Sequence, residues 1–205
     1  MTKRVSLYID GFNLYYALKE KNWQRFYWLN PYELGQNLLQ PDQALTDVKY
    51  FTARIKGRNP KKTARQANWL EAMTDTGKIK LFYGHYLFNK KDCNKCGAKI
   101  SIPEEKMTDV NIAVEMLRDA YEDLFDHAWV ISGDSDLVPP IVAIRKKFPN
   151  KKITVIFPPG SNSYRLKTSA NAFLMLGRKT LKDSQFPDQY TKSDGYVLHR
   201  PQSWR

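Results

Sequence analysis

The stretch Val5-Ser6-Leu7-Tyr8-Ile9-Asp10-Gly11 decides the fold that this chain is expected to adopt. Its first five residues are largely β-branched, aliphatic or aromatic, and a short run of this kind is typical of a buried strand. The Asp-Gly pair ends the run, because both residues favour turns. Residues 12–21 then indicate a helix, since Leu14 and Leu18 lie one helical turn apart.

The same alternation of strand and helix continues along the chain. The strongest pattern spans residues 107–124, where apolar residues recur at spacings of three and four, as on one face of a helix. Strands are expected over 48–54, 79–88, 129–132, 153–157 and 172–176, and helices from Pro31 and over 62–74, 135–147 and 161–170. This alternation predicts an α/β fold: a doubly wound, mostly parallel, Rossmann-like sheet with helices on both faces.

The chain of 205 residues, 42% of them hydrophobic, is long enough for one domain with a substantial core. We expect this domain to span residues 1–187 and to contain a polar, lysine-rich insert near 89–99, which interrupts the third strand pattern. Residues 184–205 are polar and aromatic without clear periodicity. We therefore expect residues 188–205 to form a C-terminal tail that packs loosely on the domain.

Charge and hydrophobicity narrow the class of partner. The 33 Lys and Arg residues outnumber the 21 Asp and Glu residues, for a net charge of +12. This excess favours a polyanionic partner such as nucleic acid, although many basic proteins have none. No apolar run approaches the roughly 20 residues that span a bilayer, no signal region follows Met1, and two cysteines make no disulfide framework. We therefore expect a cytoplasmic protein with no membrane partner.

Four aspartates fall where such a sheet binds its ligands, at the carboxyl ends of the strands. Asp10 ends the first strand, and Asp134 and Asp136 directly follow the strand over 129–132. Asp109 lies in the first turn of the strongest predicted helix, whose N-terminus reaches the same edge if the helix leads into the next strand. Four carboxylates from three separate parts of the sequence are then expected to converge.

Converging carboxylates repel one another and have raised pKa values unless a cation lies among them. Such oxygen ligands suit Mg²⁺ or Mn²⁺, and one or two of these ions can activate water against a phosphodiester. Asn13 could hydrogen-bond a metal-bound water or a phosphate oxygen. Each aspartate alone could equally cap a helix or end a turn. Their coincidence at one edge favours the metal site.

Three blocks of the sequence carry these residues: Tyr8-Ile9-Asp10-Gly11-Phe12-Asn13-Leu14, Glu105-Lys106-Met107-Thr108-Asp109-Val110-Asn111 and Ser132-Gly133-Asp134-Ser135-Asp136-Leu137. In this order they resemble the signature blocks of the NYN domain, and Phe157-Pro158-Pro159-Gly160 continues the likeness, which covers roughly residues 4–187. NYN domains are grouped with the PIN-like nucleases. The resemblance implies a doubly wound sheet, an acidic pocket that binds Mg²⁺ or Mn²⁺, and RNA cleavage. The positions that match are Asp10, Asn13, Asp109, Asp134 and Asp136.

A dense basic stretch over residues 54–65 follows a predicted strand, so it should lie on the same edge as the aspartates. Contacts from such a loop to phosphates would position RNA without reading its sequence, and the alternative is a solvated loop. Two serines near a helix N-terminus could also contact phosphate. The candidate RNA-binding residues are Arg54, Lys56, Arg58, Lys61, Lys62, Ser132 and Ser135. The aromatic cluster over 23–28 could stack on bases, but core packing is the favoured interpretation.

Cys93-Asn94-Lys95-Cys96 looks like half of a zinc knuckle. A structural zinc needs four ligands, so His85 or another protomer of a homo-oligomer would have to complete the site. A regulated dithiol or two unconnected thiols are the alternatives. His85, His127 and His199 are expected to be structural or exposed.

These features together predict a metal-dependent ribonuclease, in which the ion lowers the pKa of its water and no histidine is required. One alternative is a regulatory protein that binds RNA on the same fold without cleaving it. Another is a phosphatase with an aspartyl nucleophile, which also places Asp after the first strand. That chemistry usually needs a second acid two residues later, where this chain has Phe12.

Overall fold

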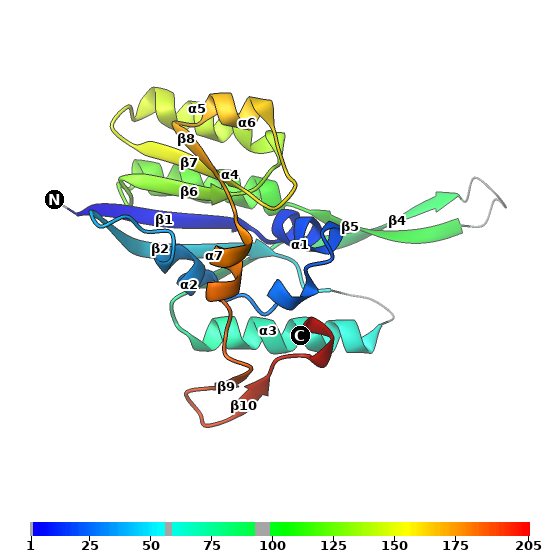
Figure 1. Cartoon of the computed structure of the whole chain (residues 1–205). Helices are drawn as coiled ribbons and strands as arrows, with labels where there is room; N and C mark the ends of the chain where they lie inside the picture. The colour runs from blue at the N-terminus through cyan, green and yellow to red at the C-terminus, as the bar shows by residue number, and fades with distance from the viewer. Residues whose placement is uncertain (1, 56–58, 93–98) are drawn as a thin grey trace.

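The computed structural model describes residues 2–55, 59–92 and 99–205. Its centre is a six-stranded parallel sheet with the strand order β3-β2-β1-β6-β7-β8 (Figure 1). The strands are β1 (Lys3–Asp10), β2 (Gln43–Thr52), β3 (Lys80–Tyr83), β6 (His127–Ile131), β7 (Lys152–Phe157) and β8 (Ala172–Met175). The chain builds outward from β1 to β3, then returns to build β6 to β8 on the other side. This confirms the predicted doubly wound sheet, with its switch point between β1 and β6.

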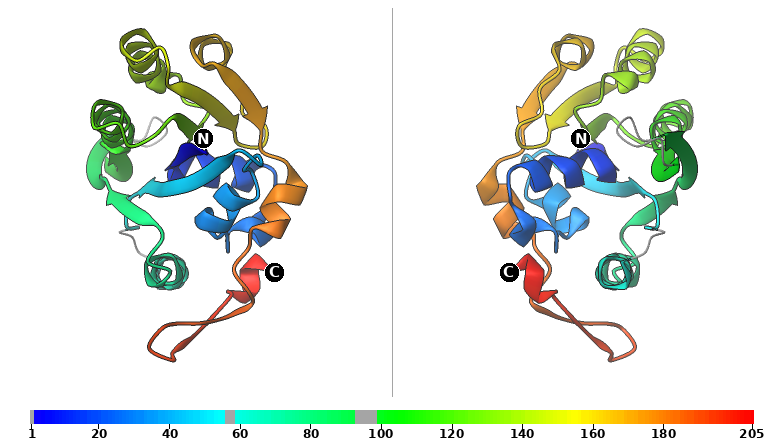
Figure 2. Two further views of the ribbon diagram at one scale, coloured as in Figure 1. Left: turned by 90° about the vertical axis from the view of Figure 1, so that its left-hand side faces the viewer. Right: turned by 90° about the vertical axis from the view of Figure 1, so that its right-hand side faces the viewer.

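Helices cover both faces of the sheet, as predicted (Figure 2). Successive residues of β1 point to opposite faces, so Leu7 and Ile9 belong to one core and Tyr8 to the other. The first core includes α1 (Gly11–Glu20), α2 (Pro31–Gln36), α3 (Pro60–Asp75) and α7 (Arg178–Asp183), and the second includes α4 (Thr108–Tyr121), α5 (Val138–Lys147) and α6 (Tyr164–Ser169). None of the helices in the described ranges is long and apolar enough to cross a membrane.

The strand expected over residues 79–88 is in fact two strands with different partners. β3 ends at Tyr83, and the Gly84 N–H donates to the Thr52 carbonyl as the chain leaves the sheet. β4 (His85–Asp92) then pairs antiparallel with β5 (Lys99–Lys106), and the resulting hairpin projects from the domain (Figure 1). Periodicity could not show this, because a strand keeps its pattern when it changes partner. Cys93 and Cys96, with the zinc hypothesis, lie outside the described residues.

The C-terminal segment, expected to be a loosely packed tail, contains short elements and contacts the first core. Beyond α7 the chain forms the antiparallel strands β9 (Gln189–Thr191) and β10 (Val197–His199), followed by a short 3-10 helix, η3 (Gln202–Trp204) (Figure 2). Leu198 in β10 is only 2% exposed and belongs to the first core. The Trp28 indole N–H donates to the Pro187 carbonyl at 2.8 Å. Each short strand contributes too few apolar residues for a period to be visible in the sequence.

A buried ionic network holds α4 against the sheet. The Lys49 ammonium on β2 is completely buried, and it lies 2.5 Å from Asp119 and 2.8 Å from Glu115, both on α4. The Tyr8 hydroxyl on β1 donates to Asp119 at 2.5 Å. A buried cation is tolerated only when charged and hydrogen-bonding partners surround it. The network therefore sets how α4 sits on the sheet, and with it the position of Asp109 at the start of that helix.

Candidate functional site

Three carboxylates gather at the carboxyl edge of the sheet, beside the switch point. Asp134 and Asp136 follow β6, and Asp109 lies in the first turn of α4. Each can offer an oxygen atom such that all three oxygens lie within 4.8 Å of one another. Asp109 and Asp134 are half-buried, and Asp136 is exposed. The sequence therefore identified three residues from two distant segments that the fold does bring together.

The loop after β6 is built to hold Asp134 and Asp136 in place. The Asp134 carboxylate accepts a hydrogen bond from the Asp136 N–H at 3.0 Å and caps η2 (Ser135–Leu137). The Asp134 N–H donates to the Ser132 hydroxyl at 3.0 Å. A Cβ at Gly133 would lie 2.8 Å from the Ser161 Cβ, which is closer than such atoms approach in real structures. Position 133 therefore requires glycine for this packing.

Asp10 lies beside these three carboxylates rather than among them. It is only 4% exposed, and its two oxygens accept hydrogen bonds from the Asn13 N–H at 2.9 Å and the Ser132 hydroxyl at 3.0 Å. Burial, with smaller contributions from the charges of Asp109 and Asp134, raises the pKa of Asp10 to about 7, although the two hydrogen bonds oppose the shift. Asp10 is thus a helix cap and also a carboxyl group held close to its neighbours' charges.

Asn13 connects the first helix to the loop after β6. Its side-chain oxygen accepts a hydrogen bond from the Gly133 N–H at 2.8 Å, which leaves the amide NH₂ as a donor. Asn13 lines a cleft together with Asp10, Asp109 and Asp134. The same cleft is lined by Tyr16, Glu20 and Ser161, which sequence reasoning missed. Helical spacing could have predicted Tyr16 and Glu20, because positions 13, 16 and 20 share one face of a helix.

The NYN domain family matches residues 4–177 of this chain. The chain belongs to that family. The match ends ten residues before the limit of 187 expected from the sequence, so α7 and the C-terminal hairpin lie beyond it.

Two comparisons place this NYN domain among known proteins. The chain is 26% identical, over 219 aligned residues, to 6-hydroxy-3-succinoylpyridine 3-monooxygenase from Pseudomonas putida, with 89% of this chain and 68% of that protein covered. A crystal structure of a protein of unknown function from Vibrio parahaemolyticus superposes with a TM-score of 0.58 at 20% identity. That alignment covers 90% of this chain and 97% of the other, and it shows a shared fold.

In this NYN domain the described basic candidates lie at the end of β2 and the start of α3. Arg54 follows β2, and its guanidinium lies 5.1 Å from the centre of the Tyr83 ring. Lys61 and Lys62 are in the first turn of α3, Lys61 exposed and Lys62 half-buried. This is the carboxyl edge of the parallel sheet, as the sequence predicted. Lys56 and Arg58 lie outside the described residues.

The two serine candidates differ in their surroundings. Ser132 is fully buried, and its hydroxyl already joins Asp10 to the Asp134 N–H. This burial contradicts the predicted phosphate contact and makes Ser132 a positioning residue. Ser135 is half-buried at the start of η2, and its contact with phosphate stays a prediction.

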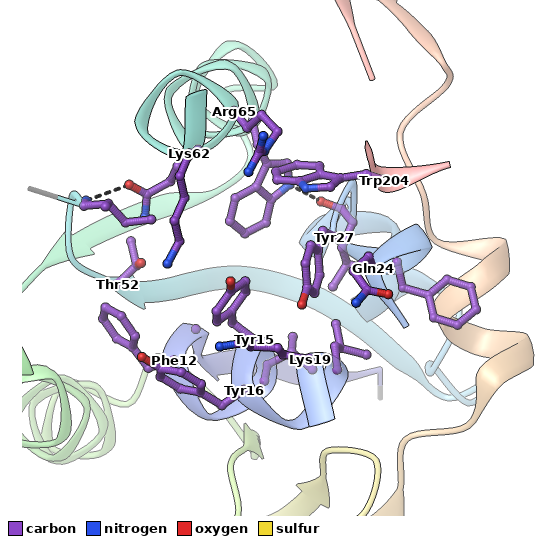
Figure 3. Close-up of a pocket in the computed structure, with 18 of the residues that line it drawn as sticks. Phe12, Tyr15, Tyr16, Lys19, Gln24, Tyr27, Thr52, Lys62, Arg65 and Trp204 are labelled. Atoms are coloured by element: carbon purple, nitrogen blue, oxygen red, sulfur yellow. Dashed lines mark hydrogen bonds between the residues drawn. The ribbon is translucent and has the colours of Figure 1, made fainter. Parts of the chain in front are cut away.

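A second cavity, of about 420 Å³, opens between α1 and α3 (Figure 3). Tyr15, Tyr27, Trp69 and Trp204 line it, and Lys19, Lys62 and Arg65 contribute positive charge. Of the aromatic cluster over 23–28, Phe26 and Trp28 are buried in the core, as expected from the sequence, and Phe26 and Tyr27 also line this cavity. The sequence did not indicate the cavity, because its walls come from five separate segments.

Proposed function

We propose that this NYN domain is a ribonuclease that hydrolyses RNA phosphodiester bonds with the help of Mg²⁺ or Mn²⁺. The supporting observation is the set of three carboxylates, from two distant segments, whose oxygens lie within 4.8 Å of one another. These donors are all hard oxygen atoms, the kind that Mg²⁺ and Mn²⁺ prefer. The set lies where doubly wound sheets bind ligands, at the switch point.

Asp109, Asp134 and Asp136 would hold the ion. When bound, the ion supplies Lewis-acid activation of water and neutralises charge on the phosphodiester. Asp10 fixes the start of α1 through the Asn13 N–H and fixes the loop after β6 through Ser132. Asn13 is held by the Gly133 N–H, so its amide NH₂ is a preoriented donor for a phosphate oxygen. Lys61 and Lys62 would contact the RNA backbone at the same edge of the sheet.

The test is incubation of the purified protein with end-labelled single-stranded and hairpin RNA, with Mg²⁺, with Mn²⁺ and with EDTA. We expect cleavage with either ion and none with EDTA. Asp134→Asn and Asp136→Asn should each lower the cleavage rate by at least about a hundredfold. The matched control is Asp42→Asn, which removes one carboxylate charge beside Lys3 at the opposite edge of the sheet.

Three results would contradict this proposal. Folded wild-type protein that cleaves neither RNA with either ion would exclude it, and RNA binding without cleavage would favour the regulatory alternative. Full activity in both Asp134→Asn and Asp136→Asn would trace the cleavage to a contaminating nuclease. Because the proposed substrate is RNA, we also propose that the protein acts in the cytoplasm.

The name of the Pseudomonas putida relative suggests a second candidate, oxygenation of a hydroxylated pyridine. The cavity between α1 and α3 is the structural observation that favours this candidate, since a planar ring could bind between its aromatic side chains. Incubation with 6-hydroxy-3-succinoylpyridine, oxygen and a two-electron reductant, followed by chromatography, tests this function directly. Conversion of the pyridine by the wild type, without RNA cleavage, would select this candidate over the ribonuclease.

A further inference from the structure

The cavity between α1 and α3, which we call the aromatic cavity, carries chemistry that the acidic cluster does not use. Its volume of about 420 Å³ is in the range of small-ligand sites, roughly 300–1,000 Å³. Tyr15 and Tyr27 pack 4.9 Å apart between ring centres (Figure 3). Trp69 on α3 also lines the cavity. Trp204 closes one end, with its ring 5.6 Å from Tyr27. Such walls suit a flat aromatic ring.

The charge around this cavity is one-sided. Among the described residues, its lining includes Lys19, Lys62 and Arg65 but no carboxylate. Among the described parts of the chain, none of these three cations forms an ion pair with an acidic side chain. The Lys62 ammonium lies 5.7 Å from the centre of the Tyr15 ring, so the face of that ring is turned toward α3 and the cavity. A ligand with both an aromatic ring and a negative charge would satisfy this arrangement.

The aromatic cavity and the acidic cleft are neighbours that share two lining residues. Phe12 and Tyr16, on the first two turns of α1, line both. An RNA chain bound at Asp109 and Asp134 would pass Phe12 and Tyr16 if its neighbouring nucleotide entered the aromatic cavity. Polar groups are also present for recognition. Gln24 lines the cavity, and burial together with the neighbouring Tyr15 raises the pKa of the Tyr27 hydroxyl.

We propose that the aromatic cavity binds the base of a nucleotide adjoining the cleaved bond, which stacks on Tyr15 while Lys62 and Arg65 contact its phosphate. This inference rests on the proposed ribonuclease function and deepens it, because it places a nucleotide-binding subsite beside the acidic cluster. Stacking on an aromatic side chain tolerates any base, since every base has a π face. Preference among bases would come from Gln24 and the Tyr27 hydroxyl.

The test measures binding separately from cleavage. Trp69 and Trp204 line the aromatic cavity, so a stacked base should quench tryptophan fluorescence. AMP, CMP, GMP and UMP are titrated in EDTA, with adenosine as the probe without phosphate and ribose 5-phosphate as the probe without base. We expect saturable quenching by at least one mononucleotide, weaker binding of adenosine, and no quenching by ribose 5-phosphate.

Two variants and two controls assign the binding to this cavity. Tyr15→Leu should weaken mononucleotide binding about tenfold or more. Lys62→Met should weaken AMP but leave adenosine unchanged. The matched controls are Tyr121→Leu, which removes an exposed tyrosine on the other face of the sheet, and Lys182→Met, which removes an exposed charge on α7. Both controls should bind like the wild type.

The outcomes separate this inference from the proposed function. Asp134→Asn protein should bind mononucleotides like the wild type. Normal mononucleotide binding by wild-type protein that cleaves no RNA would overturn only the ribonuclease function. RNA cleavage by the wild type with no mononucleotide quenching would overturn only the base-binding inference. Quenching by 6-hydroxy-3-succinoylpyridine but by no mononucleotide would also overturn it, in favour of a site for a small aromatic acid. Equal loss of affinity in Tyr15→Leu and Tyr121→Leu would place the ligand elsewhere.

Discussion

Replacing Asp10 with Asn should make the metal-free protein more stable at alkaline pH, although Asp10 caps a helix. The substitution preserves shape, and the Asn side-chain oxygen can still accept a hydrogen bond from the Asn13 N–H. The Asn NH₂ group can donate to the Ser132 hydroxyl, which now donates to Asp10. What changes is the charge, because a buried carboxylate beside Asp109 and Asp134 becomes a neutral amide.

The pKa of Asp10 sets the size of this effect. Its folded-state pKa is raised to about 7, whereas a carboxyl group in the unfolded chain titrates near pH 4. Between these values the native state binds more protons than the unfolded state, so stability falls as pH rises and is lowest above pH 7. A rise of about three pKa units corresponds to about 4 kcal/mol of lost stability. Asp10→Asn removes that loss, so it should gain up to about 4 kcal/mol at pH 8 and little at pH 4.

Urea unfolding in EDTA, at matched ionic strength and at pH 4.5 and pH 8, measures this difference. Added Mn²⁺ should stabilise the wild type by mass action and reduce the advantage of the variant. Asp42→Asn is the control of opposite sign, because its hydrogen bond to Lys3 lowers the pKa of Asp42. An Asp10→Asn protein less stable than the wild type at pH 8, or a difference independent of pH, would refute the reasoning.

Three further predictions concern the scaffold and the RNA-binding edge. Lys49→Met should lower the free energy of unfolding by about 3–5 kcal/mol, measured by urea titration, because it removes the buried cation from two buried carboxylates and leaves them only the half-exposed Arg118. Gly11→Ala should cost about 1–3 kcal/mol in the same assay, since the new Cβ would lie 2.6 Å from the Phe51 carbonyl oxygen. An unchanged urea midpoint would contradict either prediction. Changing Lys61 and Lys62 together to Met should weaken the salt dependence of binding to single-stranded RNA. The slope of log affinity against log salt, measured by filter binding, should fall by about 1.4. An unchanged slope would exclude both phosphate contacts.

The local features of this protein could be predicted from its sequence because they depend on near neighbours. The run from Val5 to Ile9 and the spacing over 107–124 are properties of short segments, and both became the expected elements. One topological rule then places the carboxyl ends of parallel strands at a common edge. That rule was enough to bring Asp134 and Asp136 to the start of α4, where Asp109 lies.

Only the tertiary structure decided which of these residues are buried and which share a cavity. Asp10 and Ser132 are both buried, and the Ser132 hydroxyl donates a hydrogen bond to Asp10. No spacing in the sequence distinguishes a buried aspartate from an exposed one. Strand β4 leaves the sheet at Gly84 without any change of pattern. The aromatic cavity joins Tyr15 to Trp204, nearly the length of the chain apart. Local periodicity carries no information about such contacts, since they depend on the packing of elements distant in sequence.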